Sequence, residues 1–316
     1  MYNFALIGLA GYIAPRHLKA IKETDNQLIV ALDKTDSVGI VDRFFPKADF
    51  FTEPERFERY IYKLQHSSAL PTIDYMSICS PNYLHDAHIR MALRNNAFAI
   101  CEKPLVLNPW NIDALQDLEQ ETGKKIFNIL QLRLHPTIQE LKKKIDSQNT
   151  DKQYDIELTY ITGRGNWYKY SWKGDDAKSG GLSTNIGIHL FDILQYIFGA
   201  VEENVTFFRQ PSFASGFFKL KNASVKWFLS IDERFLPQES RQNGQTTFRS
   251  LSIDGQKLDF TLGFEDLHTE SYKQILSGNG FGLQEAKAGI EIVQQIRNAT
   301  LSNRATYPIH PLVEKM

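Results

Sequence analysis

Cysteine is scarce in this sequence. The 316 residues include two, Cys79 and Cys101. Two thiols cannot build a disulfide framework, so the class of small disulfide-stapled domains is excluded. Each cysteine closes an apolar run, and we therefore expect both as buried thiols at strand ends.

Long apolar runs and an excess of one charge are also missing. No run is long enough to span a bilayer, and Met1–Ile7 lacks the basic start of a signal peptide, so it is predicted to be a strand. The formal net charge is -1, which gives no reason to expect nucleic acid or an anionic membrane as partner. No His/Cys/Glu cluster has metal-ligand spacing, so no metal is expected. These features favour a cytoplasmic protein.

The chain is longer than one core usually holds, and two domains are expected. Strands and helices alternate through residue 131, and the apolar strands suit a parallel sheet buried on both faces. We therefore predict a doubly wound Rossmann domain over residues 1–131. Its predicted strands are Phe4–Gly8, Leu28–Asp33, Asp49–Phe51, Tyr75–Ser80, Ala97–Glu102 and Lys125–Leu130. Its predicted helices are Pro15–Lys22, Ser37–Phe45, Pro54–Gln65, Leu84–Asn95 and Pro109–Thr122.

A different pattern begins at residue 132 and continues to 316. Longer strands joined by turns, such as the hairpins at Lys221-Asn222 and Asp254-Gly255, predict an α/β domain with a large, mostly antiparallel open sheet. Its predicted strands are Tyr154–Thr162, Asn204–Arg209, Ala214–Leu220, Ala223–Asp232, Thr247–Asp254 and Lys257–Phe260. Its predicted helices are Thr137–Ser147, Ser183–Phe198, Leu267–Ser277 and Leu283–Thr300.

A glycine turn follows the first strand. Gly8 and Gly11 allow a tight turn beside a pyrophosphate, Ala14 takes the place of a third glycine, and Tyr12 and Ile13 complete the loop before the helix. Asp33 ends the second strand, where a carboxylate binds the adenosine ribose and repels a 2′-phosphate. This pattern predicts NAD rather than NADP as cofactor, the alternative for Asp33 being a solvated turn residue.

Two further segments end strands of the same predicted sheet. Ser80, Pro81, Asn82 and His85 follow the fourth strand, at the edge where such folds bind ligands, although Asn82 also suits a simple helix cap. Glu102-Lys103-Pro104 ends the fifth strand and would direct Lys103 into the same crevice.

The helix predicted from Ser183 carries polar residues on a largely apolar background. Asn185 and His189 are four residues apart and share a face. Burial can tune a histidine for acid–base chemistry near neutral pH, while a satisfied core histidine is the plainer alternative. Upstream, Arg164–Gly174 combines rings and cations, which suits a nucleotide sugar; a single-stranded nucleic-acid platform or plain packing are the alternatives.

The glycine turn, Glu102-Lys103-Pro104 and the Gly180–Asp192 motif together resemble the Gfo/Idh/MocA oxidoreductases over almost the whole chain. Four segments are similar to the WlbA type, the UDP-N-acetylglucosaminuronate 3-dehydrogenases of bacterial surface-polysaccharide synthesis. These segments are Ala10–His17, Ser80–His85, Leu132–Pro136 and Trp172–Asp175.

The resemblance implies NAD, a homo-oligomer (often a tetramer), Lys103 and His189 as catalytic residues, and in some relatives 2-oxoglutarate as the oxidant of bound NADH. Asn185 is predicted as the third catalytic residue. It stands where much of the family has aspartate, so it is expected to orient the substrate. The predicted cofactor contacts also include Glu102, Lys103, Gln131, Trp172 and Lys173. The predicted substrate contacts are Lys103, Arg164, Tyr168, Lys173, Ser179, Asn185 and His189.

The resemblance therefore implies NAD-dependent oxidation of the C3 hydroxyl of a UDP-sugar uronate, in the synthesis of a surface polysaccharide such as the O-antigen of lipopolysaccharide. His189 is the preferred base and Lys103 the group that polarises the oxygen, with the reverse assignment open. Two alternatives are a dehydrogenase of another sugar or polyol, and a non-catalytic NAD-binding regulator.

Overall fold

The structure is a computed structural model, and it describes residues 1–148, 152–258, 266–303, 306–314 and 316. No helix among these residues is both long and apolar enough to cross a membrane. The chain divides into two compact units. One unit consists of the described residues of Met1–Gln131 and Glu265–Lys287, and the other of those of Leu132–Phe264 and Ala288–Met316.

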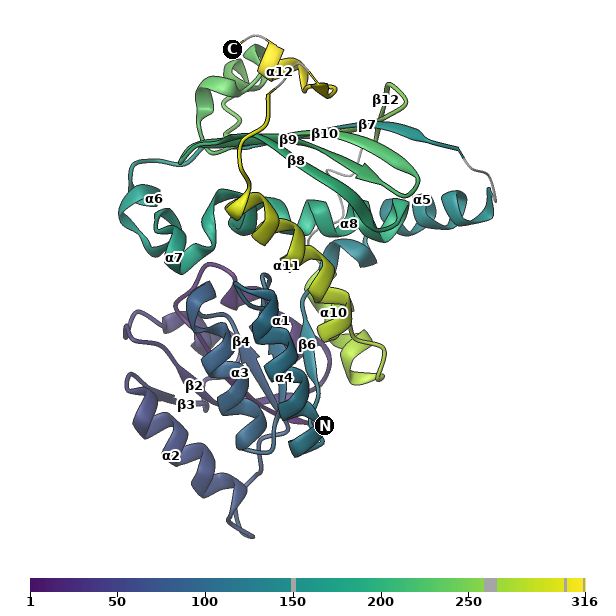
Figure 1. Cartoon of the computed structure of the whole chain (residues 1–316). Coiled ribbons are helices and arrows are strands. Elements are labelled where there is room, and N and C mark those ends of the chain that lie inside the picture. Colours follow the sequence, from purple (N-terminus) through teal and green to yellow (C-terminus); the bar gives the residue numbers. More distant parts are fainter. Residues whose placement is uncertain (149–151, 259–265, 304–305, 315) are drawn as a thin grey trace. The chain divides into compact units, whose positions relative to one another are not determined.

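The first unit is built on a six-stranded sheet in the order β3-β2-β1-β4-β5-β6, with every pair parallel (Figure 1). This order confirms the predicted doubly wound Rossmann fold. The strands are β1 (Asn3–Ile7), β2 (Gln27–Leu32), β3 (Asp49–Phe51), β4 (Tyr75–Ile78), β5 (Phe98–Cys101) and β6 (Ile126–Asn128). The crossover helices are α1 (Ala14–Glu23), α2 (Pro54–Gln65), α3 (His85–Arg94) and α4 (Pro109–Thr122).

One predicted helix of this unit is wrong. The segment Ser37–Phe45 forms only a short 3-10 helix, η1 (Gly39–Arg43). Glycine costs a helix backbone entropy, and the residue before Pro46 is disfavoured in the helical region, so the segment is limited to about one turn.

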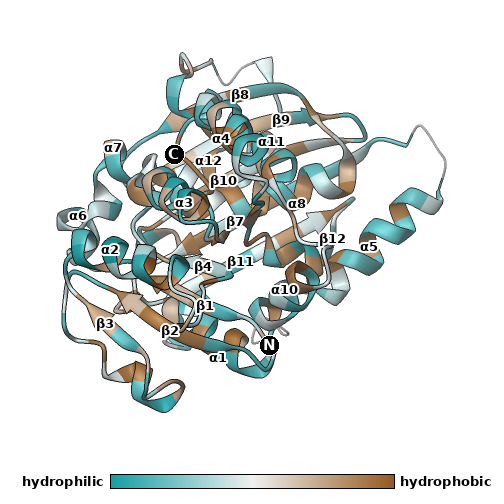
Figure 2. Cartoon of the chain, turned by 90° about the horizontal axis from the view of Figure 1, so that it is seen from below, coloured by the Kyte–Doolittle hydropathy of each residue, from teal (hydrophilic) through white to brown (hydrophobic). Residues whose placement is uncertain are grey.

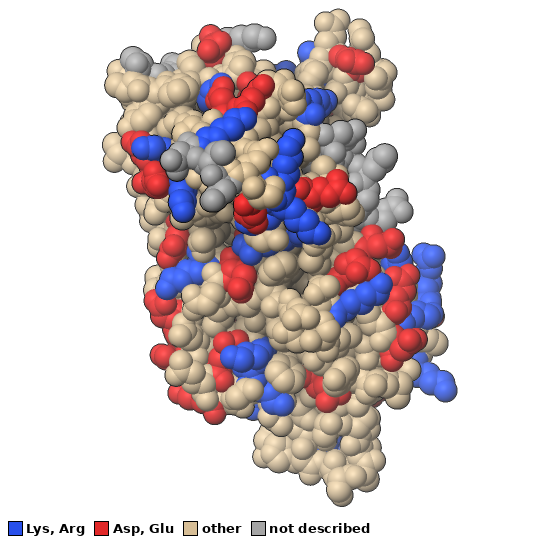
Figure 3. All heavy atoms as spheres, turned by 90° about the vertical axis from the view of Figure 1, so that its right-hand side faces the viewer, with Lys and Arg blue, Asp and Glu red and all other residues tan. Residues whose placement is uncertain are grey.

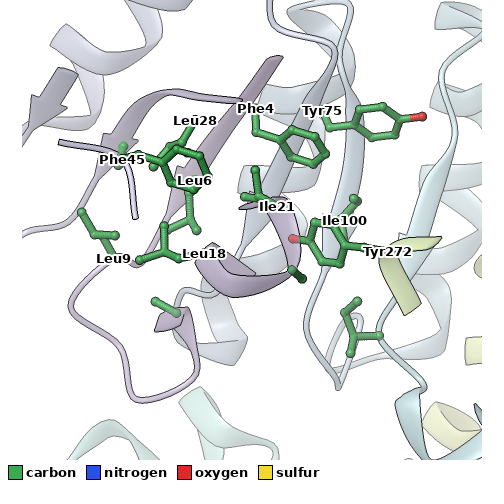
Figure 4. Close-up of a cluster of buried hydrophobic side chains, with 14 of the residues drawn as sticks. Phe4, Leu6, Leu9, Leu18, Ile21, Leu28, Phe45, Tyr75, Ile100 and Tyr272 are labelled. Carbon is green, nitrogen blue, oxygen red and sulfur yellow. The ribbon is translucent and has the colours of Figure 1, made fainter. Parts of the chain in front are cut away.

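The core of the first unit lies around β1. Phe4, Leu6 and Leu18 are fully buried, and the ring of Phe4 stacks on Tyr75 (Figure 4). The same cluster includes Tyr272 and Ile275 of helix α10 (Leu267–Leu276). The sequence analysis placed all of 132–316 in the second domain. Helix α10 packs instead with the Rossmann strands, because its apolar face completes their core.

The second unit contains a sheet in the order β12-β11-β7-β10-β9-β8. Only β7 and β10 are parallel to each other, so the sheet is mostly antiparallel, as predicted. The strands are β7 (Tyr154–Thr162), β8 (Val201–Arg209), β9 (Phe213–Leu220), β10 (Ala223–Ser230), β11 (Thr247–Ile253) and β12 (Gln256–Leu258). The end of the predicted strand Lys257–Phe260 lies outside the described residues.

Helices α5 (Pro136–Ser147) and α8 (Ile188–Phe198) lie on one side of this sheet (Figure 1). Phe191 of α8 packs edge-on against Phe218 and Trp227 of the sheet. Gly187 permits this close approach, since a Cβ there would lie 2.5 Å from a methyl of Leu229. The remaining helices are α6 (Trp167–Tyr170), η4 (Trp172–Gly174), α7 (Asp176–Ser179), η5 (Ser183–Gly187), η6 (Glu233–Phe235), α9 (Gln238–Gln242), α11 (Leu283–Asn298) and α12 (Pro311–Glu314), with η2 (Asn82–Leu84) and η3 (Gln131–Leu134) earlier in the chain.

Both predicted hairpins are confirmed. Two-residue loops join β9 to β10 and β11 to β12, with Asp254 and Gly255 both at positive φ. Strands such as β2 are mostly hydrophobic along their length, whereas the helices alternate between hydrophobic and hydrophilic residues (Figure 2). Acidic and basic side chains are interspersed over the face shown in Figure 3, in keeping with the near-zero net charge.

Candidate active site

The glycine turn after β1 lies against the end of β4. Gly8 has φ +91°, and a Cβ on it would lie 2.6 Å from the carbonyl carbon and oxygen of Cys79. No side chain fits there. Gly11 N–H donates to the carbonyl of Gly8 at 3.0 Å, which closes the turn and brings the chain to the start of α1. The first predicted glycine is therefore required by packing as well as by backbone angle.

The start of α1 fits a phosphate group. The helix has no side-chain cap and no acidic residue in its first turn, so no carboxylate or hydroxyl competes with a phosphate there. Pro15 has no N–H, and the N–H groups of Ala14 and Arg16 donate to the carbonyls of Gly11 and Ile13. Tyr12 is 88% exposed beside this end. Asp33 lies next to the turn, and its carboxylate accepts hydrogen bonds from Ala10 N–H at 2.9 Å and Thr35 N–H at 3.0 Å. The glycine turn, the start of α1 and the carboxylate of Asp33 thus lie together, which is the arrangement that binds a dinucleotide in Rossmann folds.

Gln131 stands at the end of the same unit. Its side-chain oxygen is buried, and no described residue donates a hydrogen bond to it. A buried unsatisfied acceptor is costly, so this amide is suited to a ligand's donor. Gln131 was predicted as a cofactor contact, and this geometry fits that prediction.

The loop after β4 is held by two histidines. Ser80 Oγ contacts His88 Nδ1 at 2.8 Å. The buried ring of His85 lies between two backbone carbonyls, with Nε2 2.8 Å from Ser80 O and Nδ1 2.7 Å from Pro104 O. Burial lowers the pKa of His85, although both carbonyls favour its protonated form. His85 was predicted to contact the cofactor, and the structure places both of its ring nitrogens against backbone.

Glu102 and Lys103 point to different surroundings. Lys103 is half-buried, while Glu102 is 6% exposed. The Oε1 atom of Glu102 lies 3.1 Å from His17 Nε2 and 2.9 Å from His268 Nε2. Burial raises the pKa of Glu102, but the hydrogen bonds from the two histidines outweigh it and hold that pKa well below its ordinary value. The carboxylate predicted as a cofactor contact thus binds interior histidines.

The sequence analysis missed His17 and His268. One signal was available for His17, which lies on the apolar face of α1 with Ala14, Leu18 and Ile21. His268 has no local signal. With Glu102, these histidines are a group of potential metal ligands that the structure assembles from distant positions. Their nitrogen–oxygen distances are those of hydrogen bonds, so a metal is not needed to explain the group.

In the second unit, the segment before α8 is a π-helical turn, η5 (Ser183–Gly187). Such turns are rare and occur often at functional sites. Two glycines at positive φ, Gly180 and Gly181, lead into it. Asn185 lies on this turn and donates from Nδ2 to the hydroxyl of Tyr168 at 2.7 Å. Tyr168 is 3% exposed, and burial raises its pKa.

His189 lies one turn further, at the start of α8. Its ring contacts Tyr160 of β7 edge-on, with centroids 6.0 Å apart, and Arg249 lies over the same tyrosine. Asp192, on the same helix, contacts η3. There Arg133 donates from Nη2 to Oδ1 of Asp192 at 2.7 Å and from Nε to Oδ2 at 2.9 Å. This buried bidentate pair fixes the rotation of the helix that carries His189.

The aromatic loop forms two short helices, α6 and η4. The ammonium of Lys173 lies 5.5 Å from the ring centre of Trp167 and 5.6 Å from that of Trp172. Arg164 is exposed on the same loop. Ser179 is fully buried, and its hydroxyl donates to the Asp175 carbonyl at 3.0 Å, so it serves the turn before η5. Substrate contacts from these residues stay predictions.

The Rossmann unit with its glycine turn and strand-end lysine defines an NAD-binding oxidoreductase. Two models of one family match the chain: "Oxidoreductase family, NAD-binding Rossmann fold" over residues 2–129, and "Oxidoreductase family, C-terminal alpha/beta domain" over residues 150–225. The chain belongs to the Gfo/Idh/MocA oxidoreductase family.

Solved structures extend this result over the full length. The chain is 50% identical to the WlbA (WbpB) dehydrogenase from Thermus thermophilus in complex with NAD and alpha-ketoglutarate, with a TM-score of 0.95 and coverage of 99% of this chain and 100% of that one. For the same dehydrogenase in complex with NAD and UDP-GlcNAcA, the identity is 49% and the TM-score 0.94, at the same coverage.

Curated relatives match shorter segments. The D-glucoside 3-dehydrogenase of Escherichia coli is 27% identical over 128 residues, which are 40% of this chain and 36% of that protein. The chain spans 36% of the length of that protein, and 54% of the length of the glucose-6-phosphate 3-dehydrogenase of Bacillus subtilis, to which it is 24% identical over 204 residues.

Proposed function

We propose that the protein oxidises the C3 hydroxyl of UDP-N-acetylglucosaminuronic acid to the 3-keto sugar with NAD. One observation carries this proposal: the 49% identity, over nearly the whole chain, to a dehydrogenase crystallised with NAD and UDP-GlcNAcA. The product would serve the synthesis of a bacterial surface polysaccharide such as an O-antigen. We further propose a cytoplasmic homotetramer, with 2-oxoglutarate able to reoxidise bound NADH.

The residues of the first unit fit the cofactor. The glycine turn and the start of α1, which has no side-chain cap, suit the pyrophosphate. Asp33 suits the ribose hydroxyls. The buried side-chain oxygen of Gln131 can accept a hydrogen bond from a donor group on the cofactor. NAD supplies the carbon that accepts the hydride from C3.

His189 takes the hydroxyl proton as the C3–H bond breaks and the carbonyl forms. Lys103 stabilises the negative charge that develops on the oxygen. Asn185 hydrogen-bonds the sugar. The hydroxyl of Tyr168 accepts a hydrogen bond from the Asn185 amide and so orients that side chain. Lys173, supported by Trp167 and Trp172, supplies a cation for the diphosphate or the uronate.

The test is turnover of purified protein on matched substrates. UDP-GlcNAcA, UDP-GlcNAc, D-glucose and myo-inositol are each incubated with NAD, with and without 2-oxoglutarate. We expect a 3-keto product only from UDP-GlcNAcA. We expect 2-hydroxyglutarate only in the incubation that contains both UDP-GlcNAcA and 2-oxoglutarate. Turnover of a free sugar in preference to the uronate would contradict the proposal, and tight NAD binding with no turnover would favour a regulator.

A further inference from the structure

Three buried histidines surround the turn that carries Lys103. His17 comes from α1, His85 from the start of α3 and His268 from α10, and each is at most 1% exposed. Each contacts Glu102 or Pro104, the two neighbours of Lys103, through a ring nitrogen. Elements far apart in the sequence thus converge on one turn within a single compact unit.

The hydrogen bonds around Glu102 form a chain with one consistent direction. Ser77 Oγ and the Tyr272 hydroxyl are 2.6 Å apart, and Tyr272 is 2.8 Å from His17 Nδ1. If Ser77 donates to Tyr272 and Tyr272 to His17, then His17 Nε2–H donates to Glu102. His268 Nε2–H donates to the same carboxylate oxygen, and its buried Nδ1 has no hydrogen-bond partner among the described residues.

The second oxygen of Glu102 binds the turn itself. The backbone N–H of Lys103 donates to Oε2 at 3.2 Å. The ionised carboxylate therefore accepts three N–H groups, and charge-assisted bonds of this kind are stronger than neutral ones. On the other side of Lys103, the carbonyl of Pro104 lies 2.7 Å from His85 Nδ1. The backbone on both sides of the lysine is fixed by buried side chains.

We propose that His17, His85 and His268 act, through Glu102 and Pro104, as positioning residues for Lys103. In this role they act on the backbone beside Lys103, through their contacts with Glu102 and Pro104. Lysine has a long flexible side chain, so the place of its Cα determines where the ammonium can reach. A shift of about 1 Å in a catalytic group can lower turnover by roughly 10²-fold. This inference rests on the catalytic role of Lys103 in the proposed function.

Variants at His268 separate a hydrogen-bond donor from mere bulk. His268→Gln keeps an N–H near the position of Nε2, whereas His268→Leu fills a similar space without a donor. Glu102→Gln presents an amide N–H to the Lys103 N–H and so removes one acceptor. Asn26→Leu is the matched control, because Asn26 is also buried and hydrogen-bonded in this unit, with its side chain contacting Tyr2 and Thr24 between α1 and β2.

Two measurements are made on each full-length variant: hydrogen exchange of the peptide containing Lys103, and kcat with the dissociation constant for NAD. For His268→Leu and Glu102→Gln we expect faster exchange at Lys103 and a fall of kcat by about tenfold or more, with NAD affinity within about threefold. His268→Gln should stay close to the wild type in hydrogen exchange at Lys103 and in kcat. Asn26→Leu should change neither the exchange at Lys103 nor kcat.

Three results would overturn the proposal: unchanged exchange and kcat in His268→Leu, equal losses in His268→Gln and His268→Leu, or a stoichiometric metal in the wild type that His268→Leu loses. Exchange needs no substrate. It therefore tests the positioning role even if the wild type fails to oxidise UDP-GlcNAcA, so that failure of this inference and failure of the proposed function are distinguishable.

Discussion

The amide of Asn185 donates to the hydroxyl of Tyr168 at 2.7 Å. The tyrosine is buried in the short helix α6, and the asparagine lies on the π turn before α8. The sequence analysis predicted both residues as substrate contacts. The structure gives them different positions, with the buried tyrosine supporting the more exposed asparagine. An amide held in this way presents its oxygen in one orientation.

Removing the Tyr168 hydroxyl should weaken substrate binding more than it weakens the fold. Tyr168→Phe removes the acceptor of one hydrogen bond from the Asn185 amide, and the loss of about 1 kcal/mol is expected to raise KM for the UDP-sugar by roughly fivefold. Steady-state kinetics check this. Tyr62→Phe, at a tyrosine that is 58% exposed on α2, is the control and should leave KM unchanged. Equal effects of the two changes would remove the role assigned to Tyr168.

Lys103→Ala and His189→Ala should each lower kcat strongly while NAD stays bound. Acid–base groups typically contribute ~10²–10⁴-fold, and neither side chain belongs to the glycine turn. The measurements are kcat and NAD affinity by fluorescence. His66→Ala, an exposed histidine on the first unit, is the control. If His189→Ala keeps near-normal turnover, histidine is not the base and Lys103 takes that role.

Asp33 should govern the choice between NAD and NADP. A carboxylate beside the glycine turn repels a 2′-phosphate, and Asp33→Asn removes the charge while keeping an oxygen for the Ala10 N–H. We expect the preference for NAD to narrow in Asp33→Asn and further in Asp33→Ala. Dissociation constants for both dinucleotides measure it, with Asp36→Asn as control. Equal affinity of the wild type for both would contradict the assignment.

His310 should make the protein less stable in mild acid. Its Nδ1 accepts from Leu312 N–H and its Nε2 contacts Thr159, while burial, with a smaller effect of Lys226, lowers its pKa to about 4. Between pH 4 and the ordinary value of 6.5 the folded protein binds fewer protons at this site than the unfolded chain. Stability therefore falls as pH falls through this window.

Between pH 7 and pH 5, the titration of His310 should lower the free energy of unfolding by about 2 kcal/mol. Urea midpoints at the two pH values measure it. In His310→Gln the midpoint should change less with pH than in the wild type, whereas His66→Ala should behave as the wild type does. A pH dependence that is the same in His310→Gln and the wild type would show that His310 does not titrate in this way.

Periodicity and turn residues predicted most of the fold. The strands Asp49–Phe51 and Tyr154–Thr162, and the helix Pro54–Gln65, were predicted to the residue, because Pro54 marks a helix start and apolar runs mark buried strands. The failure at Ser37–Phe45 is local, since Gly39 and Pro46 outweigh the apolar pattern between them. The packing of α10 with the first unit depends on tertiary contacts of Tyr272 that no local pattern contains.

The site was predicted less completely than the fold. The glycine turn and the place of Asp33 follow from a local fingerprint, and both were found. The cluster of His17, Glu102 and His268 was not, because its members are 85 and 166 residues apart along the chain and meet only in the folded unit. His85 and Ser179 also contact backbone carbonyls through their side chains, and their predicted ligand contacts stay predictions.

The most direct test of the proposed function follows the hydrogen at C3 of the sugar. UDP-GlcNAcA deuterated at C3, and a control deuterated at C4, are each converted in a single turnover, and the reduced cofactor is analysed by mass spectrometry. The account predicts deuterium in the cofactor from the C3-labelled sugar only, with a slower reaction for that substrate. Transfer from the C4-labelled sugar, or no transfer from C3, would contradict it.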